Sequence, residues 1–143
     1  MVDDAAGALV ADKVAAWVDD PESDVEYAEQ VEGRWAVRMR QTVRDATTVW
    51  FWIGDRTLIA EAYVLPAPPV ELAVYRLALR RNGSSFRVNF ALDREGALVL
   101  RSRIPLERLS ESELEYLLAD FYQTIEVSFR ALIAAGFERE KQP

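Results

Sequence analysis

The fold is decided by residues 33–65, which read GRWAVRMRQTVRDATTVWFWIGDRTLIAEAYVL. Over 35–39, large apolar residues alternate with alanine and arginine, as in a strand with one buried face. Residues 47–53 are mostly β-branched or aromatic, and apolar residues alternate again over 57–65. Because only short turns separate these runs, we expect them to form an antiparallel meander.

Apolar residues at helical spacing lie before and after this stretch. They predict helices over 4–19, 69–81 and 110–136. The last of these begins with a capping box, in which Ser110 and Glu113 each bond the backbone of the other. The helix over 69–81 is apolar on most of its sides, which is typical of a helix buried in a core or an interface.

Two more strands are expected over 85–92 and 97–104, with a turn between them. Segment 25–31 is ambiguous, and a short edge strand is one interpretation of it. The resulting order is α-β-β-β-α-β-β-α, which indicates the α+β class: a five-stranded antiparallel sheet with helices packed on one face. The large aromatic residues that this face should bury are Trp35, Phe51, Phe86 and Phe90.

Missing residue types exclude several classes of site. The chain has no histidine and no cysteine, which excludes a Ser–His–Asp triad, zinc held by His or Cys, and disulfides. Lys13 and Lys141 are the only lysines, and no glycine-rich phosphate-binding loop precedes either of them. The acidic turn at 19–24 lacks the spacing of a calcium loop. These exclusions leave catalysis by paired carboxylates open. Our expectation is a protein without enzyme activity, catalytic residues, metal or cofactor.

Length and hydropathy indicate one domain. A chain of 143 residues, half of them hydrophobic, can bury a core of its own, and we expect a single domain over 1–143. No apolar run reaches the roughly 18–20 residues that cross a bilayer. The first four residues include Asp3 and Asp4, whereas a signal peptide begins with basic residues. We expect a cytoplasmic protein with no membrane partner.

Charge is unevenly distributed along the chain. Residues 1–32 have a net charge of -9, residues 33–103 a net charge of +6, and residues 104–143 a net charge of -4. The basic excess is almost wholly arginine, whose guanidinium binds carboxylates in a forked geometry and stacks on aromatic rings. Either acidic helices lie beside a basic sheet, or a basic face of the sheet binds an acidic partner.

The polar side of the strands predicts an open sheet face that is rich in arginine. Strand 47–53 is apolar on both sides, so Trp50 and Trp52, which share one side, are candidates to join this face. A solvated face on which Glu61 pairs with arginine is the alternative interpretation. The candidate residues for partner binding are Arg38, Arg40, Trp50, Trp52, Tyr63, Arg87, Arg101 and Arg103.

A set of short motifs follows in a fixed order along about residues 30–137. They are Trp35-Ala-Val-Arg38, Gly54-Asp-Arg-Thr-Leu58, Pro66-Ala-Pro68, Leu77-Ala-Leu79-Arg-Arg-Asn82, Phe90-Ala-Leu-Asp93 with Gly96, Arg103-Ile-Pro105 and Ala135-Gly136-Phe137. In order and spacing these motifs resemble the YbjN-type domain in its actinobacterial form. The order of helices and strands resembles the type III secretion chaperone-like fold.

The family's label implies a bacterial sensory transduction regulator. The resemblance in fold implies a chaperone that binds unfolded segments of effector proteins, commonly as a homodimer. Our hypothesis is a non-enzymatic homodimer, chaperone- or adaptor-like, that binds a segment of a protein partner. The first alternative is a domain that binds a small molecule or uses carboxylates as an enzyme. The second is binding of single-stranded nucleic acid, which the net charge of -7 disfavours.

Overall fold

The meander of residues 33–65 forms as its alternation predicts. The structure is a computed structural model that describes residues 4–138. The three strands are β2 (Arg34–Arg40), β3 (Ala46–Ile53) and β4 (Thr57–Leu65). Trp35 lies opposite Phe51, and Phe51 lies opposite Ala60. All three side chains are buried, and this shared burial fixes the register of the strands.

The sheet has six strands rather than the five expected. The other three are β1 (Val25–Val31), β5 (Asn89–Leu92) and β6 (Leu98–Pro105). The order across the sheet is β1-β2-β3-β4-β6-β5, and neighbouring strands are antiparallel. The prediction of five strands is wrong because segment 25–31 pairs with β2 as an edge strand. Only Val25 of β1 is buried, so this strand carries little of the alternation that marks a half-buried strand.

Strand β5 is shorter than the strand predicted over 85–92. It begins at Asn89, and the residues before it form a loop. Val88 and Phe90 are buried, but the side chain of Phe86 is 83% exposed. The prediction that Phe86 lies in the core is therefore wrong.

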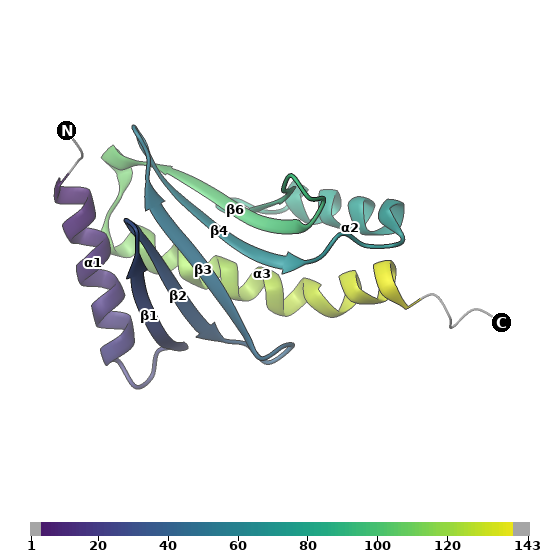
Figure 1. Cartoon of the computed structure of the whole chain (residues 1–143), viewed down its shortest axis with the longest axis horizontal. Coiled ribbons are helices and arrows are strands. Elements are labelled where there is room, and N and C mark those ends of the chain that lie inside the picture. The colour runs from purple at the N-terminus through teal and green to yellow at the C-terminus, as the bar shows by residue number, and fades with distance from the viewer. Residues whose placement is uncertain (1–3, 139–143) are drawn as a thin grey trace.

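The helices of residues 4–138 cover one face of the sheet and leave the other open. They are α1 (Asp4–Asp19), α2 (Glu71–Gly83) and α3 (Glu111–Phe137), with the short 3-10 helix η1 (Leu106–Arg108) before α3. Figure 1 shows α3 passing behind the strands along the length of the molecule, with α1 at the end near β1 and α2 at the other end. Trp17 of α1 and Phe121 of α3 share one hydrophobic core with Phe51 of the sheet.

Helix α3 supplies the largest apolar stripe. Its buried residues are Leu114, Leu117, Leu118, Phe121, Ile125, Ser128, Leu132 and Gly136. At its start, Ser110 accepts a hydrogen bond from the backbone N–H of Glu113 at 3.0 Å, as the capping box predicts. The Glu113 carboxylate binds Arg87, not the backbone N–H of the cap. Among residues 4–138, no helix is both long enough and apolar enough to span a membrane.

Candidate protein-binding face of the sheet

We call the side of the sheet that points away from the helices the open face. Strand pairing places Ala36, Trp50, Glu61 and Arg101 in one row across four strands. Residues two positions away on a strand share the same side. The candidate residues that flank the row are therefore Arg38 and Arg40 on β2, Trp52 on β3, Tyr63 on β4 and Arg103 on β6. The structure thus brings together every predicted contact residue except Arg87.

Aromatic side chains give the open face its apolar area. Trp50 and Trp52 are partly exposed, and Tyr63 is 52% exposed. The guanidinium of Arg34 lies 4.3 Å from the centroid of the Trp52 ring, within range of a cation–π attraction. Large aromatic rings lose few rotamers when they are covered, so partly exposed tryptophans beside an exposed tyrosine are typical of contact surfaces.

The two arginines of β6 differ in how firmly they are held. Nε of Arg101 donates a hydrogen bond to the Glu61 carboxylate at 2.9 Å. This Glu61–arginine pair is the one expected under the alternative interpretation, a solvated face. Arg103 is exposed, and within residues 4–138 it has no ion-pair partner. Arg103 is therefore the β6 arginine whose guanidinium is available to a carboxylate of another molecule.

The arginines of β2 lie near the β1 edge. Nε of Arg38 lies 3.4 Å from the Glu26 carboxylate in an exposed ion pair. Arg40 donates a hydrogen bond to the backbone oxygen of Ser23 at 2.9 Å. Exposed ion pairs contribute at most about 1 kcal/mol, so Arg38 can exchange Glu26 for a partner's carboxylate at little cost.

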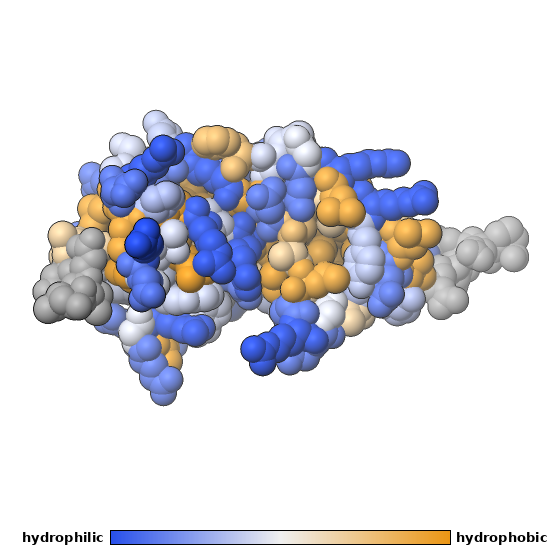
Figure 2. Space-filling model, turned by 90° about the horizontal axis from the view of Figure 1, so that it is seen from above, coloured by the Kyte–Doolittle hydropathy of each residue, from blue (hydrophilic) through white to orange (hydrophobic). Residues whose placement is uncertain are grey.

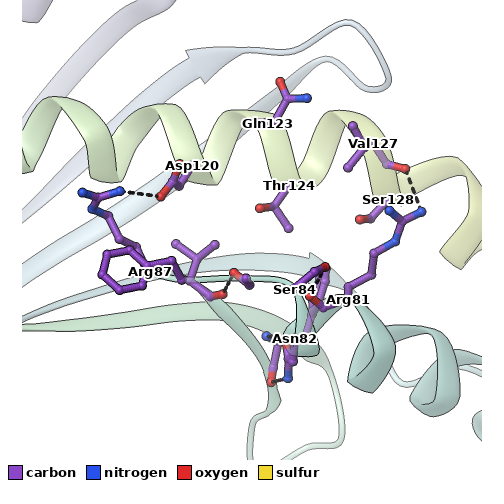
Figure 3. A pocket seen from close by; sticks show the side chains of 13 residues that line it. Arg81, Asn82, Ser84, Arg87, Asp120, Gln123, Thr124, Val127 and Ser128 are labelled. Atoms are coloured by element: carbon purple, nitrogen blue, oxygen red, sulfur yellow. Dashed lines mark hydrogen bonds and ion pairs between the residues drawn. The ribbon is translucent and has the colours of Figure 1, made fainter.

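Arg87 lies on the helix side of the sheet, in the loop formed by residues 84–88. Its Nε donates to Glu113 at 2.8 Å, and one terminal nitrogen donates to Asp120 at 3.2 Å, as Figure 3 shows for Asp120. The guanidinium also lies 4.9 Å from the centroid of the Tyr116 ring. The hydrogen bond to Glu113 outweighs the opposing effect of burial and raises the pKa of Arg87 above its usual range. These contacts on α3 keep Arg87 away from the open face.

A groove of about 360 Å³ lies between this loop and the middle of α3 (Figure 3). Gln123 and Thr124 line its α3 wall. Its charged groups are engaged, because Arg81 donates to a backbone oxygen of α3 and Asp120 binds Arg87. The remaining amides and hydroxyls can bind polar groups but supply no acid–base pair. Within residues 4–138, no cluster of acidic side chains is arranged to hold a metal ion.

A larger groove, of about 580 Å³, separates α1 from α3. In its wall the indole N–H of Trp17 donates to the Glu115 carboxylate at 2.9 Å, and the Lys13 ammonium lies 2.9 Å from the same group. The hydrogen bond from Trp17, followed by that from Lys13, holds the pKa of Glu115 below its usual range. Sequence reasoning missed both grooves because their walls come from segments far apart in the chain.

Exposed apolar side chains also occur on α2. Leu72 and Leu79 are 63% and 68% exposed, whereas Val74 and Ala78 are buried. Within residues 4–138 only one side of α2 is buried, so the core covers part of its apolar surface and burial of the rest in an interface stays a prediction. On the side of the molecule seen in Figure 2, apolar side chains lie in patches separated by hydrophilic ones.

Comparisons with known proteins identify relatives and folds similar to this one. An uncharacterised protein of Mycobacterium leprae is 31% identical over 91 residues, which are 63% of this chain and 50% of that protein. The chain spans about half the length of the curated relatives it matches.

Two solved structures show the fold. The type III secretion chaperone SycH of Yersinia pestis, solved with a stable fragment of YscM2, has a TM-score of 0.58 and 20% identity, over 87% of this chain and 98% of its own. YbjN of E. coli has a TM-score of 0.56 and 14% identity, over 84% of this chain and 90% of its own. The antiparallel sheet with helices on one face is thus a type III secretion chaperone-like fold.

The family relationship comes from a separate comparison. The family model YbjN, with the description "Putative bacterial sensory transduction regulator", matches residues 11–134. This range contains all six strands, α2 and most of α1 and α3. The chain belongs to the YbjN family.

Proposed function

We propose that this protein is a non-enzymatic binding module, chaperone- or adaptor-like, which holds an acidic segment of another protein on its open face. One observation carries this proposal: Trp50, Trp52 and Tyr63 lie among arginines on a sheet face that no helix of residues 4–138 covers. Tryptophan, tyrosine and arginine are the residue types that contribute most at protein interfaces. The fold shared with SycH, which was solved with a fragment of YscM2, supports a protein as the partner.

The chemistry of the open face defines the kind of segment it fits. Arg38 and Arg103 can each bind a carboxylate through two parallel hydrogen bonds. The tryptophans between them offer apolar area to side chains that alternate with those carboxylates. An extended segment places alternate side chains on one side, so its carboxylates can face Arg38 and Arg103 together. The net charge of -7 opposes long-range approach of nucleic acid.

The experiment is affinity capture from a lysate of the protein's own host, with and without nuclease treatment, and with two matched variants. Arg38→Glu with Arg103→Glu reverses two charges on the open face, and Arg94→Glu with Arg130→Glu reverses two exposed charges elsewhere. We expect partner proteins that the native and control chains retain and the open-face variant loses. Equal retention by all three would contradict the proposal. Retention that disappears only on nuclease treatment would favour nucleic acid.

Two further parts of the hypothesis remain our proposals. The homodimer that the family resemblance implies is tested by sedimentation velocity over a range of concentrations. The cytoplasmic location is tested by fractionation of the host.

A further inference from the structure

In the loop before β5, two neighbouring side chains, Phe86 and Arg87, each lie on the side opposite to the one that a strand would give them. Phe86 should share the buried side with Val88 and Phe90, yet it is 83% exposed. Arg87 should share the open face with Asn89, yet it binds carboxylates on α3. The segment thus has the sequence of a strand and the structure of a loop.

Within residues 4–138, the pairing that this strand would make with the end of β6 is missing. β5 pairs with β6 only from Asn89 opposite Arg101 to Leu92 opposite Leu98, whereas β6 continues to Pro105. The same register, continued, places Phe86 opposite Ile104 and Arg87 opposite Arg103. Within residues 4–138, no other strand pairs with this side of residues 102–105.

An open groove marks this position. Its volume is about 240 Å³, and both the loop and the unpaired end of β6 line it. The lining residues are Phe86, Arg87, Ser102, Arg103, Ile104, Pro105, Arg108 and Glu113. Ser102 is buried there, and within the described part of the chain its hydroxyl has no hydrogen-bond partner. The groove therefore offers space beside Ile104 for an apolar side chain.

Arg87 ties the loop to α3, and Ser85 bonds within the loop, where its hydroxyl donates to the Val88 carbonyl and its N–H to the Asn82 carbonyl at 3.1 Å. The Arg87 guanidinium binds Glu113 at 2.8 Å and Asp120 at 3.2 Å, and lies over the rings of Tyr116 and Phe86. These contacts are all on the α3 side or within the loop. If Arg87 turned to the open face, it would lose both ion pairs, and Phe86 would turn to the core.

We propose that residues 85–88 form a strap with two positions. In the open position, seen here, Arg87 is latched to α3 and Phe86 is exposed. In the closed position the strap lengthens β5 along β6, Phe86 covers Ile104, and Arg87 joins Arg103 on the open face. One part of this inference rests on the proposed function. An acidic segment bound to the open face should favour the closed position of the strap, because only there does Arg87 face the partner's carboxylates.

The test uses the free protein and a variant without the latch. Glu113→Gln with Asp120→Asn removes both ion pairs of Arg87, and Glu107→Gln with Glu111→Gln removes two exposed charges nearby that do not contact Arg87. Because each partly exposed ion pair shifts such an equilibrium a few-fold, we expect the ratio of closed to open strap to rise about tenfold in the latch variant. Slower hydrogen exchange of the backbone amides of Arg87 and Arg103, the pair whose N–H groups the continued register directs at each other, reports this shift. The control variant should exchange as the native chain does.

A second readout follows the side chain of Phe86. We expect Phe86→Ala to leave the urea midpoint of the native chain unchanged, because the ring is exposed, and to lower the midpoint of the latch variant, in which the ring is covered. The proposal of a two-position strap would be overturned by two results together. Hydrogen exchange would be as fast or faster in the latch variant than in the native chain, and Phe86→Ala would leave the urea midpoint unchanged in both. Since no partner is present, this result is independent of the capture experiment.

Discussion

Asn82 binds both backbone groups of Phe90 and so closes the outer edge of the sheet. Its side-chain oxygen accepts a hydrogen bond from the Phe90 N–H at 2.7 Å, and its side-chain nitrogen donates to the Phe90 carbonyl at 3.1 Å. One amide side chain thereby takes the place of a neighbouring strand beside β5. Edge strands with unpaired backbone groups pair readily with other chains, so this contact protects the molecule at an edge where β5 is only four residues long.

Replacing Asn82 by alanine should destabilise the protein and open this edge. Two hydrogen bonds disappear and the partly buried groups of Phe90 lose their partners, so we expect the free energy of unfolding to fall by about 1–3 kcal/mol. Urea denaturation measures this loss, and sedimentation velocity should show more self-association than in the native protein. Asn89→Ala, at an exposed position of the same strand, is the control. An Asn82→Ala protein as stable as the native one would show that the edge does not depend on this side chain.

Gly136 packs too closely against the chain around α2 to carry a side chain. A Cβ there would lie 2.6 Å from Cγ2 of Val74 and 3.0 Å from Cβ of Pro68. Val74 is fully buried and β-branched, so its methyl group cannot rotate away without displacing its neighbours. We expect Gly136→Ala to lower the free energy of unfolding by about 1–3 kcal/mol, although alanine is the better helix former.

Gly83 provides the matched comparison for this prediction. It also lies at the end of a helix, but a Cβ there would meet no atom of the described residues within 4 Å. We expect Gly83→Ala to be neutral or to stabilise the protein by up to about 1 kcal/mol, because only the helix propensity changes. Equal urea midpoints for the two alanine variants would refute the steric argument at Gly136.

The strands of the meander could be predicted because their information is local. Trp35, Val37 and Met39 alternate with exposed or small residues, and the buried side follows directly from that period. Strand β1 lacks this signal because it lies at an edge, where only Val25 is buried. The open face could be predicted for the same reason, since every strand places alternate residues on it.

The errors around Phe86 and Arg87 arise from contacts between distant parts of the chain. The local alternation assigns Arg87 to the open face, but Glu113 and Asp120 attract it to α3. Glu126 of α3 is a similar case, since its carboxylate accepts hydrogen bonds from the backbone N–H of Thr42 and from Gln41, both at 2.7 Å. No sequence pattern indicates which carboxylate of a long helix meets which distant residue.

Stability should depend on pH through Glu115. The Trp17 indole and then Lys13 hold the pKa of this carboxylate below its usual value of about 4.3. Because its pKa is lowered in the folded state, the charged carboxylate stabilises the fold above that usual value, and this contribution is lost as the pH falls through the folded pKa. We expect Glu115→Gln to lower the urea midpoint at pH 7 and to differ less from the native protein near pH 3. A difference that is the same at both pH values would contradict this account.

The two arginines of β6 should separate stability from binding. Arg101 is held by Glu61, so Arg101→Glu places two carboxylates side by side and should lower the free energy of unfolding by about 1 kcal/mol. Exchanging the charges, with Glu61→Arg and Arg101→Glu together, should restore most of that loss.

Arg103 has no such partner within residues 4–138, so Arg103→Glu should leave the urea midpoint unchanged and still weaken retention of the protein partner. If Arg103→Glu kept full retention while Arg101→Glu lost it only in proportion to unfolding, the open face would be a solvated surface and not a binding site.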